Sequence, residues 1–237
     1  MTSGVVLEMT AIRKNYGALR PLRIQSLAVR RSERVAIAGL DAPAAESLVN
    51  LVTGASVPDE GEVRLFGRAT TDVVDGDEWL SSLDRFGIVS DRAVLLEGAA
   101  LLQNLALPFT LEIDPVSSGT RERVERLAAE CGIGAEWLEQ PSAGLPPAVR
   151  VRAHLVRALA LGPEILLMEH PSASLPEGER RPFGAVVRRV CEARALTALI
   201  VSLDAEFSTA AADRILTLEP ATGGLKDSSR KGWFRRS

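Results

Sequence analysis

Residues 34–54 constrain the fold most, because they have the frame of a phosphate-binding loop. An apolar run at 35–38 predicts a strand that ends at Gly39. After a short loop, apolar residues at 48–52 predict a helix that Gly54 closes. A strand, a tight turn and a buried helix in this order are typical of the place where a nucleotide-binding chain holds phosphate.

The residues that would bind phosphate there are substituted. The motif G-x-x-x-x-G-K-[ST] uses its lysine on the phosphates and its hydroxyl on Mg²⁺, but here the last three positions hold Ala44, Ala45 and Glu46. A carboxylate about 4 Å from a phosphate charge is repelled by roughly 1–4 kcal/mol at a surface-like dielectric. Asp41 and Pro43 also fit an ordinary capped helix start that binds nothing. Both interpretations stay open at this point.

Composition excludes several classes of function. The 237 residues suit one large domain or two small ones, and the net charge of −3 argues against non-specific nucleic-acid binding. The N-terminus has no secretory signal, and no apolar run reaches the ~18–20 residues that span a bilayer. Cys131 and Cys191 lack metal-like spacing, and His154 and His170 are the only histidines, so no metal site is expected. We expect a cytoplasmic protein.

Strands and helices alternate along most of the chain. Strands are predicted at 5–10, 22–29, 35–38, 62–66, 86–90, 165–168, 198–202 and 213–218, and helices at 48–52, 76–83, 120–131, 149–161 and 177–194. This alternation predicts an α/β fold with a mainly parallel sheet, preceded by an antiparallel β portion. Residues from about 92 to 160 are predicted as an inserted helical subdomain. We expect one domain over 1–225 and a basic, mobile tail over 226–237.

Six segments in a fixed order carry a family resemblance. They are KNYG at 14–17, GEVRLFG at 61–67, FGIVSDRAVLLEGAALLQNLALPF at 86–109, RVRAHLVRALALGPEILLMEHPSASL at 150–175, IVSLD at 200–204 and ADRILTLE at 212–219. Together with residues 34–54, they resemble the ATP-binding cassette (ABC) ATPases, the nucleotide-binding subunits of ABC transporters. The resemblance runs from about residue 4 to residue 219 and implies a P-loop NTPase-like fold.

The resemblance assigns site roles to positions that no longer hold the family's residues. The Q-loop glutamine corresponds to Asp91, the Walker B Asp-Glu pair to Glu169 and His170, and the switch histidine to Leu203. The signature motif L-S-G-G-Q corresponds to LPPAV at 145–149, and the D-loop aspartate corresponds to Pro176. Glu169 could still bind Mg²⁺, and His170 could act as a general base or simply complete its own hydrogen bonds.

The nucleotide-contacting positions are altered in the same way. The resemblance places them at Tyr16, Gly39, Asp41, Ala45, Glu46 and Ser47. Tyr16 could stack on adenine, which is worth roughly 1–3 kcal/mol by analogy with base stacking, or it could be a core aromatic that needs no ligand. No cofactor is expected, and weak ATP binding remains an alternative.

These substitutions predict a cassette subunit that has lost ATP hydrolysis and acts as a structural or regulatory partner. The resemblance implies a transmembrane permease as that partner, at the inner face of the plasma membrane, and a homodimer or heterodimer with another ABC ATPase. Since ATP in this family lies between the phosphate loop of one subunit and the signature motif of the other, pairing with an intact subunit would leave one defective surface in each site. The alternatives are a weakly active transport ATPase and a soluble regulator without a membrane partner.

Two further surfaces have open interpretations. The residues Leu95, Leu96, Leu101, Leu102 and 103–109 could form an apolar groove for a permease helix, or they could only hold the helical subdomain together. The tail combines basic residues with Trp233 and Phe234, so it could contact anionic lipid or a partner chain, or remain solvated.

Overall fold

Strands from residues 5–30 and 60–69 form an antiparallel sheet. The computed structural model describes residues 4–73 and 75–228. β1 (Val5–Lys14) pairs with β2 (Leu22–Arg30) on one side and with β4 (Glu60–Leu65) on the other, and β5 (Arg68–Ala69) extends the edge. β2 alternates buried and exposed residues along most of its length, as expected of a sheet with one face covered.

A mainly parallel central sheet follows. Its order is β10-β9-β3-β8-β7-β6, and only β10 runs antiparallel to its neighbour. The strands are β3 (Arg34–Ala38), β6 (Phe86–Val89), β7 (Ile165–Glu169), β8 (Thr197–Val201), β9 (Arg214–Glu219) and β10 (Gly224–Asp227). β7 and β8 are buried at every residue, because both faces of the central sheet are covered.

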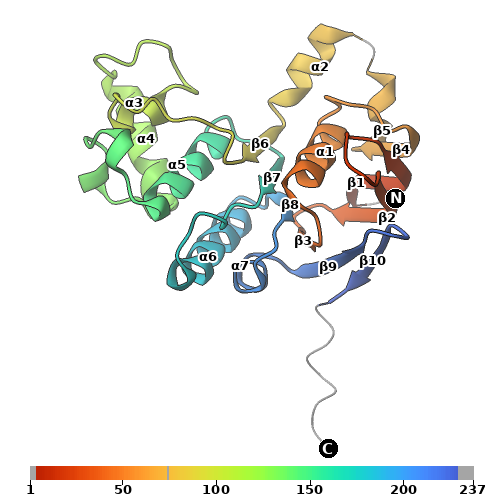
Figure 1. Ribbon diagram of the computed structural model, residues 1–237. Helices are drawn as coiled ribbons and strands as arrows, with labels where there is room; N and C mark the ends of the chain where they lie inside the picture. The colour runs from red at the N-terminus through yellow and green to blue at the C-terminus, as the bar shows by residue number, and fades with distance from the viewer. Residues whose placement is uncertain (1–3, 74, 229–237) are drawn as a thin grey trace, which may run out of the picture.

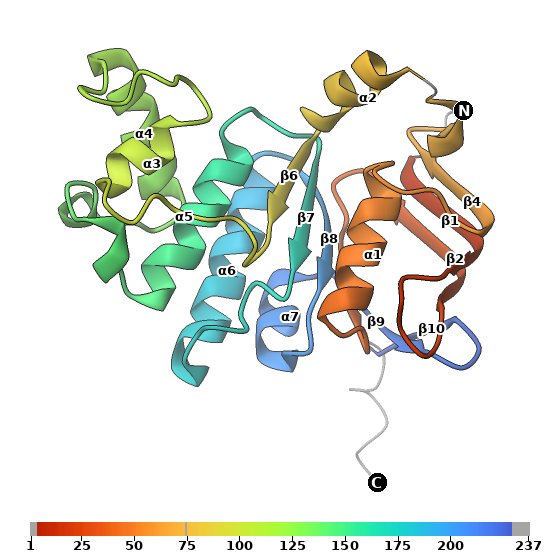
Figure 2. The ribbon, with the colours of Figure 1, turned by 45° about the horizontal axis from the view of Figure 1, so that its top comes forward.

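Helices cover the two faces of the central sheet. α1 (Ala42–Val52) lies between the two sheets, while α6 (Glu177–Ala193) and α7 (Ala205–Ala211) lie on the other side (Figures 1 and 2). β7 divides its side chains between these layers with the period of two expected of a strand. Ile165 and Leu167 pack in the core that contains α1, and Leu166 and Met168 pack in the core that contains α6.

A helical lobe projects from the edge where β6 lies (Figure 1). It contains α3 (Leu101–Ala106), α4 (Ser118–Glu130) and α5 (Pro147–Leu159), whereas α2 (Gly76–Leu83) stands apart with Asp75 as its cap. Short 3-10 turns occur at Thr70–Asp72, Ala135–Trp137 and Ser142–Gly144. Among residues 4–73 and 75–228, no helix has the length and apolar character needed to cross a bilayer.

The leucines of the expected docking groove mostly belong to the core of the lobe. Leu95, Leu101 and Leu102 are buried there, and only Leu96 is about half exposed, at 49%. The structure therefore favours the second interpretation, in which these leucines hold the lobe together.

The expected fold class is confirmed, with three differences in detail. Residues 92–100 and 107–117 form turns and loops rather than helix. α7 was not predicted, because seven residues are too few to show a helical period. The tail prediction is wrong for residues 226 and 227, which belong to β10, where Lys226 pairs with Glu219. The rest of the tail from residue 229, including Trp233 and Phe234, lies outside the described residues.

Candidate functional site

The predicted catalytic positions meet at the carboxyl ends of the parallel strands. A cavity of about 440 Å³ opens there, which we call the carboxylate cavity. Its lining includes five residues that the sequence analysis named: Asp41, Asp91, Glu169, His170 and Leu203. Loops at the carboxyl ends of the strands in an open α/β sheet are the usual place for a ligand site.

The start of α1 is closed by its own cap. Asp41 accepts a hydrogen bond from the Ala44 N–H through its carboxylate (2.9 Å) and another from the Ala45 N–H through its carbonyl (2.9 Å). Before it, Gly39 has a φ of 93°, and a side chain there would lie 3.0 Å from the carbonyl oxygen of Leu218. Two N–H groups that a phosphate loop would direct at an anion are therefore used inside the turn.

The three residues that follow lie in different environments. Ala45 is fully buried, and Ser47 is 6% exposed. Glu46 is partly exposed, and its carboxylate accepts a hydrogen bond from the Nη1 of Arg92. A carboxylate thus lies where the family pattern has a metal-binding hydroxyl, and a guanidinium already contacts it.

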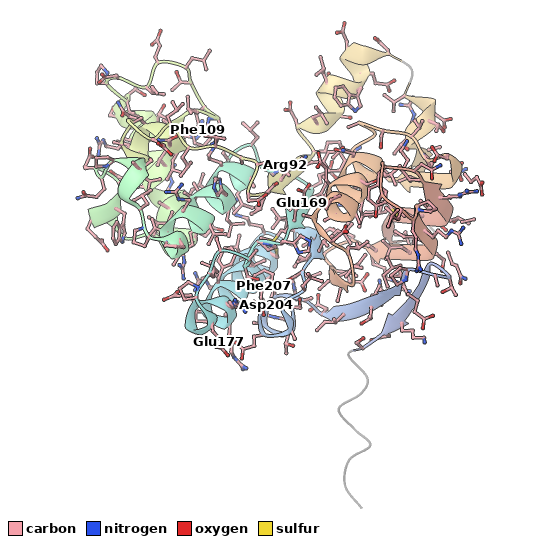
Figure 3. All side chains as sticks on the ribbon, in the orientation of Figure 1. Arg92, Phe109, Glu169, Glu177, Asp204 and Phe207 are labelled. Carbon is pink, nitrogen blue, oxygen red and sulfur yellow. The ribbon has the colours of Figure 1, made fainter. Side chains whose placement is uncertain are left out.

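Arg92 connects three elements at this edge of the sheet (Figure 3). Its Nη2 donates to both carboxylate oxygens of Glu169, at 2.6 and 2.8 Å. The hydroxyl of Ser90 donates to the same carboxylate at 3.0 Å and accepts from the Nε of Arg92 at 3.2 Å. We call Arg92 with Glu46, Ser90 and Glu169 the Arg92 clamp. The Glu169 side chain is only 7% exposed, so its charge depends on these partners.

His170 has an unusual backbone conformation directly after β7. Its φ is 43°, its N–H donates to the Val201 carbonyl at 2.8 Å, and its buried Nε2 has no hydrogen-bond partner among the described residues. Leu203 is 68% exposed at the position of the switch histidine and supplies no polar group. The His170 imidazole is therefore the one titratable ring in the cavity lining.

Asp204 is a site residue that the sequence analysis missed. Its carboxylate accepts from the N–H groups of Glu206 and Phe207, each at 3.0 Å, and from the hydroxyl of Ser172 at 3.1 Å. Arg180 lies 3.3 Å from the same carboxylate and is the only arginine or lysine in the lining of the cavity. These partners stabilise the negative charge of Asp204, which is labelled in Figure 3.

Tyr16 lies where the resemblance implies, beside the start of α1. It lines a smaller pocket of about 180 Å³ together with Gly39, Asp41 and Ala44. Burial raises the pKa of the Tyr16 hydroxyl, and the nearby carboxylate of Asp41 raises it further. Tyr16 also packs against the core that contains α1, so it has a structural role without a ligand.

Comparison with known protein sequences identifies the family of this chain. No protein-family model matches the chain. The lipoprotein-releasing system ATP-binding protein LolD of Maricaulis maris is 32% identical over 219 residues, which cover 91% of this chain and 94% of that protein. The chain belongs to the ATP-binding proteins of ABC transporters. The methionine import ATP-binding protein MetN of Brucella abortus is 27% identical over 218 residues, and the match spans 58% of its length.

Solved structures agree on the fold of this ABC cassette. The dimeric structure of the bacterial cassette MJ0796 superposes with a TM-score of 0.76 at 21% identity and covers 93% of this chain and 96% of that one. The cbiO1 subunit of Clostridium perfringens, part of the ABC transporter complex cbiONQ, gives 0.78 at 17% identity, with 94% and 88% covered. The predicted fold class, with its inserted helical region, is confirmed.

The residues of this cassette do not fit a magnesium triphosphate in the ordinary way. Such a ligand needs a lysine on its phosphates and a Ser or Thr with an Asp on its Mg²⁺. Of the described lysines, Lys14 donates to the Val57 carbonyl at 2.7 Å and Lys226 pairs with Glu219. The Arg92 clamp already contains the carboxylates at both metal positions. No three His, Cys, Asp or Glu residues gather as a metal site within 4–73 and 75–228.

The sequence contained one signal for Arg92. The family pattern places Asp41, Glu46, Asp91 and Glu169 around one site, and that many carboxylates require a nearby cation. Arg92 directly follows the Q-loop position and is the nearest basic residue in sequence. The charge balance of the predicted cassette site therefore pointed to it.

Proposed function

We propose that this cassette subunit does not hydrolyse ATP and serves as a structural or regulatory partner of a membrane permease or of another cassette subunit. The observation that carries the proposal is the Asp41 cap, which uses the Ala44 and Ala45 N–H groups inside the first turn of α1. As the resemblance implies, the subunit would lie at the cytoplasmic face of the membrane.

The electrostatics support the loss of hydrolysis. Four carboxylates line the carboxylate cavity, and two of them are paired with guanidiniums: Glu169 with Arg92 and Asp204 with Arg180. Asp41 and Asp91 have no basic partner in the lining. In-line attack on a γ-phosphate needs cations that neutralise the developing charge. A triphosphate in this cavity would meet net negative charge instead.

The other half of a composite site is also altered. In this family, the signature motif at the start of α5 faces the nucleotide of the partner subunit, and here that helix begins at Pro147 after Pro146. Neither proline has an N–H group to donate to an anion. We therefore propose that pairing with an intact cassette does not restore a complete ATP site, and that this subunit contributes structure rather than catalysis.

A weakly active transport ATPase is the second candidate, and one observation favours it. Tyr16 lies beside the small pocket next to Gly39, while Glu169 and His170 both line the carboxylate cavity. Stacking on Tyr16 could hold a base, Glu169 could hold a metal if Arg92 moved away, and His170 could act as the general base.

The deciding experiment is a fluorescent-ATP titration with and without Mg²⁺, combined with phosphate release by the purified chain. We expect no binding at millimolar ATP and no phosphate release above a mock preparation. Ala44→Gly/Ala45→Lys/Glu46→Ser restores the loop chemistry and is expected to gain ATP binding, and Ala44→Gly/Glu46→Ser without the lysine is the matched control. Turnover by the wild type that His170→Asn abolishes would establish the second candidate instead.

A second experiment tests the partner. Extraction with detergent followed by affinity purification of the tagged chain is expected to recover a permease or another cassette subunit. Recovery of the chain alone, from cells that express its neighbouring genes, would favour a regulator without a membrane partner.

A further inference from the structure

The Arg92 guanidinium lies between two carboxylates that stand at metal-binding positions. Glu46 replaces the hydroxyl of the phosphate loop, and Glu169 replaces the Walker B aspartate, which are the two ligands that hold Mg²⁺ in P-loop proteins. Arg92 contacts both, through Nη1 to Glu46 and through Nη2 to Glu169. A single side chain thus connects the start of α1 to the end of β7.

We propose that Arg92 is a built-in cation that takes the place of the divalent metal and connects α1, β6 and β7 without any ligand. The positive charge is supplied by a side chain three residues after the end of β6, so it is always present. This inference deepens the proposed function and rests on it, because a chain that loads a magnesium triphosphate in the ordinary way would have to break the Arg92 pairs.

The geometry of the Arg92 clamp fits this role. Glu169 is 7% exposed and receives both an Nη2 contact and the Ser90 hydroxyl, so its charge is fully paired. Arg92 itself is 46% exposed, so its other face remains solvated. A planar guanidinium can join two carboxylates through different nitrogens, which a lysine ammonium on a flexible stem does less well.

Arg92 also lies at the junction between the sheet and the helical lobe (Figure 3). Two residues after it, the Val94 carbonyl accepts from Arg157 of α5 at 2.8 Å. The segment 90–94 is therefore fixed to the sheet by Arg92 and to the lobe by Arg157.

The test compares thermal unfolding of the full chain with Mn²⁺ and with a chelator. Removing Arg92 leaves two unpaired carboxylates that can bind a divalent cation. Arg92→Ala is expected to lower Tm by roughly 5 °C or more in chelator and to recover at least half of this loss in millimolar Mn²⁺. The wild type is expected to show no Mn²⁺-dependent shift.

Three further variants distinguish the loss of the Arg92 charge from the general effect of removing an arginine side chain. Arg64→Ala is the matched control, because Arg64 is 45% exposed and also pairs with one carboxylate, that of Glu62; we expect a loss of under about 2 °C and no response to Mn²⁺. Arg92→Lys keeps a positive charge and is expected to remain insensitive to Mn²⁺. Arg92→Ala/Glu46→Gln removes one ligand and is expected to lose the Mn²⁺ recovery.

The outcomes are decisive in both directions. Equal Tm losses for Arg92→Ala and Arg64→Ala, or an Arg92→Ala variant that Mn²⁺ does not stabilise, would overturn the clamp; if Arg92→Ala does not fold, Arg92→Gln is measured in the same way. The Tm measurements in Mn²⁺ and in chelator contain no nucleotide. Phosphate release by the wild type would therefore refute the proposed function without changing the Tm result. An Mn²⁺-insensitive Arg92→Ala variant would refute the clamp alone.

Discussion

Strands β6 and β7 carry an arginine–glutamate pair at each end, and the two pairs differ in burial. At the amino end, Arg85 contacts Glu164 at 2.6 Å, and both side chains are 41% exposed. At the carboxyl end, Arg92 contacts Glu169 at the same distance, but Glu169 is 7% exposed. An exposed pair contributes about 0–1 kcal/mol, whereas a buried carboxylate that loses its partner costs about 3–5 kcal/mol. Of these two pairs, the one at the carboxyl end, where the candidate site lies, is therefore expected to contribute more to stability.

Breaking these two pairs in separate variants is expected to give the largest difference in stability. Arg92→Ala is expected to lower the free energy of unfolding by about 3 kcal/mol, at the low end of the buried range because Arg92 is half exposed. Arg85→Ala is expected to cost about 1 kcal/mol, including its stacking on the Phe66 ring at 3.5 Å. Denaturant unfolding of both variants measures the difference. Equal losses would mean that burial of Glu169 does not make its pair more important.

The second effect is a pH-dependent loss of stability caused by His154 of α5, which lies near Asp91 beyond the carboxyl end of β6. Burial, with smaller contributions from the charges of Arg157 and Arg150, lowers the pKa of His154 to about 4, against the opposite effect of Asp91. Because the folded pKa lies below the ordinary value, the unfolded chain binds the proton more tightly, and stability falls as the pH falls. A shift from the usual 6.5 to about 4 corresponds to a loss of about 2 kcal/mol between roughly pH 7.5 and pH 5.

The measurement for His154 is a series of unfolding curves across this pH range. The control is His154→Leu, which has similar volume and no titrating group, so its stability is expected to fall by about 2 kcal/mol less over the same interval. Parallel pH profiles for the wild type and His154→Leu would show that another group carries the acid sensitivity.

The sequence predicted the secondary structure better than the long-range side-chain contacts of the site. Continuous apolar runs predicted β7 and β8, and the capping pattern predicted α2 with Asp75 as its cap, because these signals are local. The meeting of Asp41, Asp91 and Glu169 was implied by the family resemblance, which assigns all three positions to one site. The pairing of Arg92 with Glu169 did not, since 77 residues separate them and no local pattern encodes such a contact.

Local signals also failed where function was inferred from apolar residues. The leucines Leu95, Leu101 and Leu102 looked equally suited to a docking groove and to a core, because apolarity does not say which neighbour covers a side chain. The structure places them in the core of the lobe. Asp204 was missed because the family pattern assigns a role to its neighbour Leu203 and none to position 204.

The helices α1 and α2 have aspartate caps toward opposite ends of the central sheet and differ in burial. α1 starts at the carboxyl end of β3 with Asp41 as its cap, and α2 precedes the amino end of β6 with Asp75 as its cap. α1 is largely buried and α2 has no buried residue, so Asp41→Ala is expected to cost about 1 kcal/mol and Asp75→Ala about 0.5 kcal/mol. Asp41→Asn keeps the acceptor without the charge and should match the wild type. An Asp41→Ala variant more stable than the wild type would mean that carboxylate repulsion outweighs the cap.

The smallest effect concerns backbone strain at the two ends of the sheet. His170 follows the carboxyl end of β7 with a φ of 43°, and Ala195 precedes β8 with a φ of 50°. Glycine adopts this region without the steric conflict of a side chain. Ala195→Gly is therefore expected to raise the free energy of unfolding by about 0.5–1 kcal/mol, as measured by denaturant unfolding.

His170→Gly should stabilise at least as much if the imidazole has no function, because it also removes the buried, unpartnered Nε2. If His170→Gly instead destabilises the chain while Ala195→Gly stabilises it, the imidazole must make a favourable interaction in the folded protein. The packing of the ring would then outweigh both the backbone strain and the unpartnered Nε2.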